Sequence, residues 1–286
     1  MLLQANQCSD EMVNKIVAMM GGKLTESQIR EGLNLILQKR EAEFAEKRAR
    51  RAEAKEYERK VNAPLFDLFA KDPRSAQLRL EFQTERSRIQ KRKPQPMPPL
   101  PPDIMRPTDW LVFPPFDAQM SNKSNSGMLT TTDPSQGFME IGDNVTEDRV
   151  DTGYVYLGHS FQNDQDRNLT FNCTFQVNVS LDLLSMWGST AHASGVLRLE
   201  VWQLIYTAPW ISVLARQDTQ LFSDSTGWNE HHHNEWGQTI SVLPKTFFAP
   251  AGFRYICWAG CETTQDGGVN ADSTADTKIS LNAAIL

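Results

Sequence analysis

Hydrophobic and polar residues alternate without interruption from Leu169 to Leu183. Because successive side chains of a β-strand point to opposite faces, this pattern places the apolar residues on one face and the polar residues on the other. Such a strand is typical of an antiparallel sheet that is covered on one side only. We therefore expect Phe171, Phe175 and Val177 to lie in a hydrophobic core.

The part of the chain from residue 110 onward contains further short hydrophobic runs, of which 110–113 is the first. Including 169–183, eight strands are predicted, the others being 138–141, 154–161, 196–206, 211–215, 239–243, 253–261 and 279–285. Residues 118–137, which are rich in Ser, Asn, Gly and Thr, are predicted to form a long loop, and the acidic segment 262–276 to form turns. Many strands without an intervening helix favour an antiparallel β-sandwich of the jelly-roll type.

The first half has a helical pattern. A short helix is predicted from Asp10 to Met20, and Thr25 with Gln28 forms a capping-box signature that opens a second, long helix. This helix is expected to run to about Val61, where Asn-Ala-Pro interrupts it, and to be followed by a short helix after Pro64 and a charged one over about 75–91.

The long helix carries a narrow stripe of small residues at three- and four-residue spacing. This stripe comprises Leu35, Ala42, Ala45, Ala49 and Ala52. So thin a stripe suits close approach to another helix, so these residues are the candidates for oligomerisation or anchoring. A charged helix surrounded by solvent is the alternative interpretation.

Residues 94–115 contain nine prolines, which favour an extended polyproline segment. The predicted fold class is therefore a multi-part α+β chain. It has a helical anchoring region at 1–93, a proline-rich linker or strut at 94–109 and an antiparallel β-sandwich at 110–286.

Charge is distributed unequally between these parts. Residues 1–93 contain 20 lysines and arginines against 14 aspartates and glutamates, whereas the remainder is strongly acidic. Opposite charge would let the two parts attract each other, within one chain or between chains. Basic residues cluster at 86–93 without interleaved aromatic residues, so nucleic-acid binding is not expected.

Targeting and redox signals are few. The N-terminus has no basic segment followed by an apolar run, and no segment has the length of apolar sequence that a membrane span needs, so we expect neither a signal peptide nor a span. Cys257 and Cys261 are four residues apart in a predicted strand, about 13 Å and too far for a disulfide. Free thiols are therefore expected, as in reducing cytoplasm.

Two clusters are candidate binding sites. His231 and His233 lie in a run of three histidines that is predicted to be a loop; they are weak candidates for metal binding, because no distant ligand can be assigned. Trp228 and Trp236 flank this run and are possible ligand-facing residues, since a tryptophan can stack on a sugar ring. No cofactor is expected.

Catalytic signatures are missing from the sequence: it contains no GxGxxG, GxxxxGK[ST], HExxH or GxSxG motif, so we expect no enzyme. A helical stem, a proline strut and a terminal sandwich favour a structural or receptor-binding component of a bacteriophage-like virion. It would be a homo-oligomer, with a trimer favoured, that binds other virion proteins and a host surface glycan or receptor. The alternatives are a jelly-roll capsid protein with a basic N-terminal arm and a soluble bacterial carbohydrate-binding or toxin-like protein.

Overall fold

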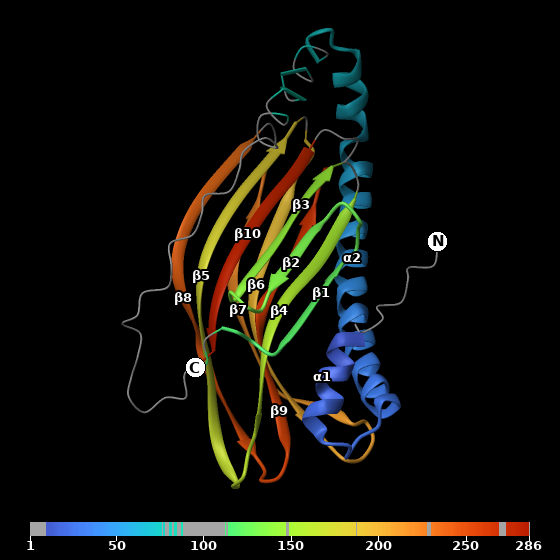
Figure 1. Cartoon of the computed structure of the whole chain (residues 1–286). Coiled ribbons are helices and arrows are strands. Elements are labelled where there is room, and N and C mark those ends of the chain that lie inside the picture. Colours follow the sequence, from blue (N-terminus) through green and yellow to red (C-terminus); the bar gives the residue numbers. More distant parts are fainter. Residues whose placement is uncertain are drawn as a thin grey trace.

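A computed structural model describes residues 10–75, 114–146, 149–186, 188–227, 230–268 and 273–285, together with single positions between 77 and 112. In these residues two helices, α1 (Asp10–Met20) and α2 (Glu26–Lys71), precede ten strands (Figure 1). The strands are β1 (Ala118–Lys123), β2 (Leu129–Asp133), β3 (Phe138–Thr146), β4 (Val150–Gln162), β5 (Arg167–Ser185), β6 (His192–Leu204), β7 (Ile211–Ser225), β8 (His231–Ala249), β9 (Arg254–Asp266) and β10 (Ser273–Ile285).

The strands form two five-stranded sheets. One sheet has the order β1-β4-β9-β6-β7 and the other β2-β3-β10-β5-β8. Every pair of neighbouring strands is antiparallel. The predicted antiparallel β-sandwich is therefore confirmed.

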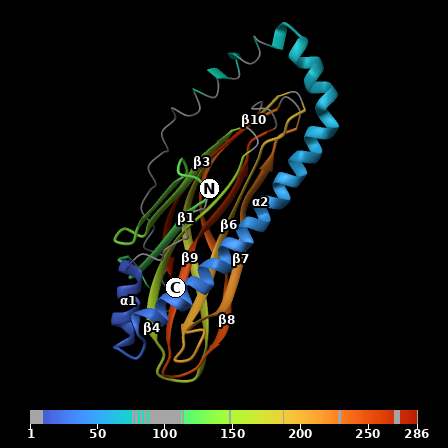
Figure 2. The same cartoon turned by 90° about the vertical axis from the view of Figure 1, so that its right-hand side faces the viewer.

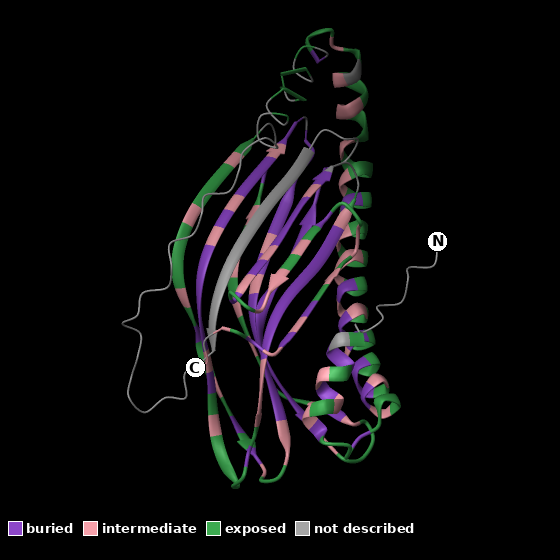
Figure 3. Cartoon of the chain, viewed as in Figure 1, coloured by how far each residue is buried: buried purple, intermediate pink, exposed green. Residues whose placement is uncertain are grey.

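A hydrophobic core fills the space between the two sheets. Phe171, Phe175 and Val177 of β5 lie in it, packed with apolar residues of β3, β4, β6, β8 and β9. The opposite face of β5 is less exposed than simple alternation predicts, because Thr174 and Gln176 are also buried. Figure 3 shows the buried residues running along the strands.

A second hydrophobic cluster lies between the helices and the outer face of the β1-β4-β9-β6-β7 sheet. Residues Ile29, Leu33 and Phe44 of α2 pack there with Trp202 of β6 and Trp258 of β9. The indole rings are completely buried, with centroids 5.0 Å apart. The first part of α2 is thus attached to the sandwich, while its C-terminal part extends past the ends of the strands (Figures 1 and 2).

The ends of α2 differ in how well they were predicted. The capping box is confirmed, since the Thr25 side chain accepts from the Gln28 backbone and the Gln28 side chain accepts from the Thr25 backbone. The predicted end near Val61 is wrong, because the helix continues through Pro64 to Lys71. Pro64 is exposed, so the lost helical hydrogen bond does not require the chain to leave the helix.

Several segments predicted to be irregular are strands. Residues 118–137 contain β1 and β2, and the histidine run opens β8. Much of 262–276 belongs to β9 and β10. These segments are rich in polar residues, but hydrogen bonds of their backbones pair them with neighbouring strands. β1 and β2 are edge strands of the two sheets.

Some predictions fall on residues outside the description. They are the proline-rich linker at 94–109 and the candidate ligand-facing residue Trp228. The described positions between 75 and 87 are helical, in agreement with the predicted helix there.

Replacing Phe175 by alanine is expected to lower the free energy of unfolding by about 3–5 kcal/mol, because the ring is completely buried between the sheets. Ser180→Ala, on the opposite face of the same strand, is the control and should change it by less than about 1 kcal/mol. Chemical denaturation of both variants measures the difference. Equal losses would contradict the assigned facing of β5.

Candidate functional site

Charged side chains line the rest of the contact between α2 and the sheet. The helix positions that face the sheet change from apolar to charged along the chain, while the strands below supply carboxylates. We call this set the charged seam, and it comprises Arg40, Lys47, Arg51 and Lys55 of α2 with His192, Arg198, Glu200, Asp218, Glu262 and Asp266 of the sheet.

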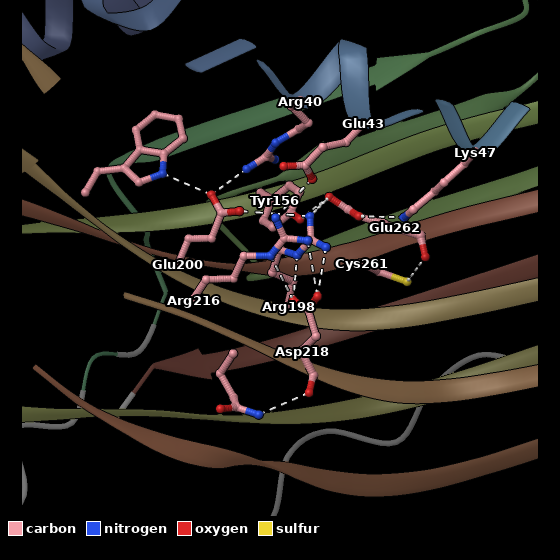
Figure 4. Close-up of polar contacts among 12 residues, drawn as sticks. Arg40, Glu43, Lys47, Tyr156, Arg198, Glu200, Arg216, Asp218, Cys261 and Glu262 are labelled. Atoms are coloured by element: carbon pink, nitrogen blue, oxygen red, sulfur yellow. Dashed lines mark hydrogen bonds and ion pairs between the residues drawn. The ribbon is translucent and has the colours of Figure 1, made fainter. Parts of the chain in front are cut away.

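Arg198 of β6 lies at the centre of the charged seam (Figure 4). Its Nε and Nη2 donate to the two carboxylate oxygens of Asp218 on β7, at 2.7 and 2.9 Å. Its Nη1 donates to Glu262 on β9, which also accepts from the hydroxyl of Tyr156 at 2.9 Å. Arg198 is 2% exposed and Glu262 3%, so both charges are balanced by each other and not by water.

Arg40 brings the helix into this network. Its guanidinium forms an ion pair with Glu200, whose Oε2 also accepts from Nε1 of Trp202 at 3.0 Å. The same guanidinium lies over the rings of Tyr154 and Tyr156, at 5.0 and 4.6 Å from their centroids. Cation–π contact and a buried ion pair therefore act on one side chain of α2.

Further along α2, the contacts become looser. Lys47 Nζ is 3.7 Å from Glu262, and Arg51 Nε is 3.7 Å from Asp266. Lys55 donates to the carbonyl oxygen of Gly267 and lies 3.7 Å from Asp266. Burial lowers the pKa of Lys55 and raises that of Asp266, although each partner favours the charged form of the other.

His192 of β6 contacts Arg51 through its Nε2, 2.6 Å from the guanidinium. Burial, together with the nearby positive charge of Arg51, lowers the pKa of His192 to about 4. The imidazole is therefore neutral near pH 7 and can accept a hydrogen bond from Arg51.

A cavity of about 460 Å³ opens beside the charged seam between α2 and the sheet. Its walls are Lys47, Arg50, Arg51 and Ala54 of the helix with Ser194, Val196, Glu262 and Thr264 of the strands. Glu262 is already paired with Arg198, so positive charge predominates in the lining. The arrangement as a whole serves attachment, because cations of α2 meet carboxylates or carbonyl groups of the sheet.

Sequence reasoning missed the charged seam. A signal was present, since Leu33, Leu37, Arg40, Phe44 and Lys47 continue one stripe at three- and four-residue spacing. From the sequence alone, the charged members of this stripe indicate exposure to solvent, because charged residues are rarely buried unless they are paired.

The candidate oligomerisation residues lie away from this contact. Leu35 and the alanines at 42, 45, 49 and 52 are exposed on α2, on the side opposite the charged seam. The stripe is therefore accessible to another chain.

The histidines lie on β8, opposite β5, where His233 is the register partner of Asp182. The buried Asp182 Oδ1 is 2.7 Å from Nδ1 of His233 and 3.4 Å from Nε2 of His231, so one carboxylate holds both rings. His232 points to the other side and contacts Asp224 at 2.9 Å. In the part of the chain that the structure describes, no three His, Cys, Asp or Glu side chains are arranged to hold a metal ion.

The remaining candidates are placed as follows. Trp236 is half-buried and packs against the core between the sheets, which is not the position expected of a ligand-facing residue. Cys173, Cys257 and Cys261 are buried free thiols, and burial raises the pKa of Cys257 and Cys261. Within the described residues, no helix combines the length and hydrophobicity that crossing a bilayer requires.

The sequence matches no protein-family model and no curated protein. Among solved structures, TmCBM61 in complex with β-1,4-galactotriose is 10% identical, with a TM-score of 0.23 over 60% of this chain and 89% of that chain. The glycoside hydrolase domain of Endo-D from Streptococcus pneumoniae R6 is 9% identical, with a TM-score of 0.20 over 58% of this chain and 21% of that chain. A chain of infectious bursal disease virus, Gx strain, is 10% identical, with a TM-score of 0.13 over 68% of this chain and 47% of that chain. Similarity at this level does not assign a function.

Removing the Glu200 side chain leaves Arg40 buried without its carboxylate, so Glu200→Ala is expected to destabilise the protein by about 3–5 kcal/mol. Glu43→Ala, which breaks the more exposed pair between α2 and Arg216, should change stability by at most about 1 kcal/mol. Urea denaturation separates the two. A comparable loss in both variants would show that burial of the charged seam does not determine its strength.

The depressed pKa of His192 predicts a pH dependence. The pKa of His192 is about 4 in the folded state and ordinarily about 6.5. Between these two pH values the unfolded chain binds a proton at His192 and the folded chain does not, so the free energy of unfolding is highest above pH 6.5 and falls as the pH decreases towards 4. His192→Gln, which cannot titrate, should lose less stability than the wild type over this range. Denaturation curves at pH 7, 5.5 and 4 give the comparison, and parallel pH profiles would contradict the assignment.

Proposed function

We propose that this chain is a structural subunit of a multi-subunit particle of the bacteriophage-like virion type, in which α2 joins subunits and the sandwich projects. The observation that carries the proposal is the two-sided character of α2. One side is attached to the sandwich through buried charges, and the other presents an exposed stripe of small residues. The chain acts through assembly and binding, without catalysis and without a cofactor.

The shape of the helix supports this role. α2 has 46 residues, and its C-terminal part passes beyond the strands (Figure 1). Tyr57, Val61 and Leu68 of its second half are exposed. An amphipathic helix normally buries its apolar positions, so this end is suited to contact with other subunits. Close packing along Ala42, Ala45, Ala49 and Ala52 would give a homo-oligomer, with a trimer favoured.

The strand order supports a particle protein as well. Strands β3 to β10 form two four-stranded sets, β3-β10-β5-β8 and β4-β9-β6-β7, and we infer that this is a jelly roll. Jelly rolls occur in viral capsid proteins and in lectins. The polar residues of β8, most of which are exposed, would then contact a host surface glycan or receptor.

A shell-forming capsid protein is the second candidate, and the jelly-roll order is the observation that favours it. In that case the basic N-terminal region would face nucleic acid. Against this, Arg40, Lys47, Arg51 and Lys55 are directed to carboxylates of the same chain. We therefore favour a subunit that does not bind nucleic acid.

Replacing Ala45 and Ala49 together by glutamate should abolish self-association, because two carboxylates would enter the contact between helices. Glutamate is a good helix former, so α2 itself should be retained. Sedimentation velocity of the full chain measures the mass, and thermal melting confirms that the sandwich is intact.

The matched control is Lys39→Gln with Arg50→Gln, which changes the net charge by the same amount at exposed positions beside the stripe. This control should keep the oligomeric mass of the wild type. A monomeric wild-type chain, or a glutamate variant with unchanged mass, would contradict the proposed role of α2.

A further inference from the structure

Four polar side chains point into the space between the sheets, where the other inward positions are mostly apolar. Asp143 on β3 alternates with the buried Ile141 and Val145. Asp151 lies on the inward side of β4, and Thr263 and Gln265 continue the inward row of β9 beyond Cys261. Buried polar groups in such a place normally have hydrogen-bond partners.

The strand register brings these side chains together. Asp151 is the direct partner of Gln265 across the β4–β9 ladder, and Gly153 is the partner of Thr263. Side chains at directly opposite positions have Cβ atoms about 5 Å apart. Asp143 lies near Asp151 although it belongs to the other sheet, because a single arginine, Arg149, contacts both carboxyl groups.

Several atoms of this group have no hydrogen-bond partner. They are Oδ2 of Asp143, Oγ1 of Thr263 and both amide atoms of Gln265. Asp143 is only 6% exposed and Gln265 is completely buried, so water from the bulk does not satisfy them. Buried oxygens without a hydrogen-bond partner are therefore present on both β3 and β9, inside the sandwich.

The charges around these residues favour a positively charged ligand. Arg149 pairs with Asp151 at 2.5 Å and lies 3.9 Å from Asp143, so one arginine faces two carboxylates. One negative charge is thus left without a counter-charge whenever both carboxyl groups are ionised.

We propose that Asp143, Asp151 and Gln265 bind a calcium ion in this space. The hydroxyl of Thr263 is a further oxygen ligand, and water completes the shell. Carboxylate, amide and hydroxyl oxygens are the ligands that calcium prefers, and calcium tolerates irregular geometry better than magnesium does. Arg149 is partly exposed, so it can turn towards solvent as the ion enters.

Ser124 and Asn125, between β1 and β2, donate hydrogen bonds to the two oxygens of Asp151, at 3.2 and 3.1 Å. A bound ion would therefore hold together β3, β4, β9 and the segment that joins β1 to β2. Binding should be visible as stabilisation of the whole sandwich.

The test uses the full chain after treatment with a chelator. At a calcium concentration about one hundred times the Kd, Tm should rise by about 5 °C, and isothermal titration should give one ion per chain. Asp143→Asn and Gln265→Leu should each remove most of this rise. Asp224→Asn, at a carboxylate beside the histidines, is the control and should keep it.

Three results would overturn the proposal. They are no calcium-dependent rise in the wild type, an undiminished rise in Asp143→Asn, or an equal rise with magnesium at the same concentration. Because both test variants are read as a response to calcium and not as absolute stability, a change in their basal Tm does not affect the conclusion. The oligomeric mass measured for the helix variants is independent of this outcome.

Discussion

The attachment of α2 to the sandwich depends on ion pairs from which water is excluded. The helix residue Arg40 and its partner Glu200 are almost completely buried, and beside them Arg198 pairs with Glu262 inside the sheet. Removing such charges from water is expensive, and their mutual attraction offsets this only when the geometry and the additional hydrogen bonds are good. Trp202, Tyr156 and the bidentate Asp218 supply those bonds, so the orientation of the helix is defined by directional contacts and not only by apolar area.

This attachment separates the helix into two functional sides. Hydrophobic contacts around Phe44 and the indoles of Trp202 and Trp258 hold its first part, and ion pairs continue the contact towards Lys55. The outward side of α2 is exposed. Small and apolar residues are exposed there, and this is the basis for the proposal that the chain joins an assembly.

The parts of the fold that could be predicted are those in which the sequence pattern and the environment agree. The alternation from Leu169 to Leu183 and the Thr25–Gln28 capping box are local signals, and both elements formed as expected. Arg198 and Glu200 alternate with buried leucines in β6 and therefore read as a solvent-facing row. Only the position of α2, which comes from a distant part of the chain, buries them. Asp143 and Gln265 could not be related from the sequence either, because they belong to different sheets and come to the same part of the interior only when the two sheets pack together.

The carboxylates that form ion pairs with α2 lie far from it in the sequence. Glu200 lies 160 residues after Arg40, with which it pairs. Glu262 and Asp266 lie more than 200 residues after their helix partners Lys47 and Arg51. During synthesis on the ribosome, α2 is therefore complete long before its counter-charges exist, and domains form in the order in which they are made. In that interval both sides of the helix are exposed, so the proposed joining of subunits would not have to wait for completion of the fold.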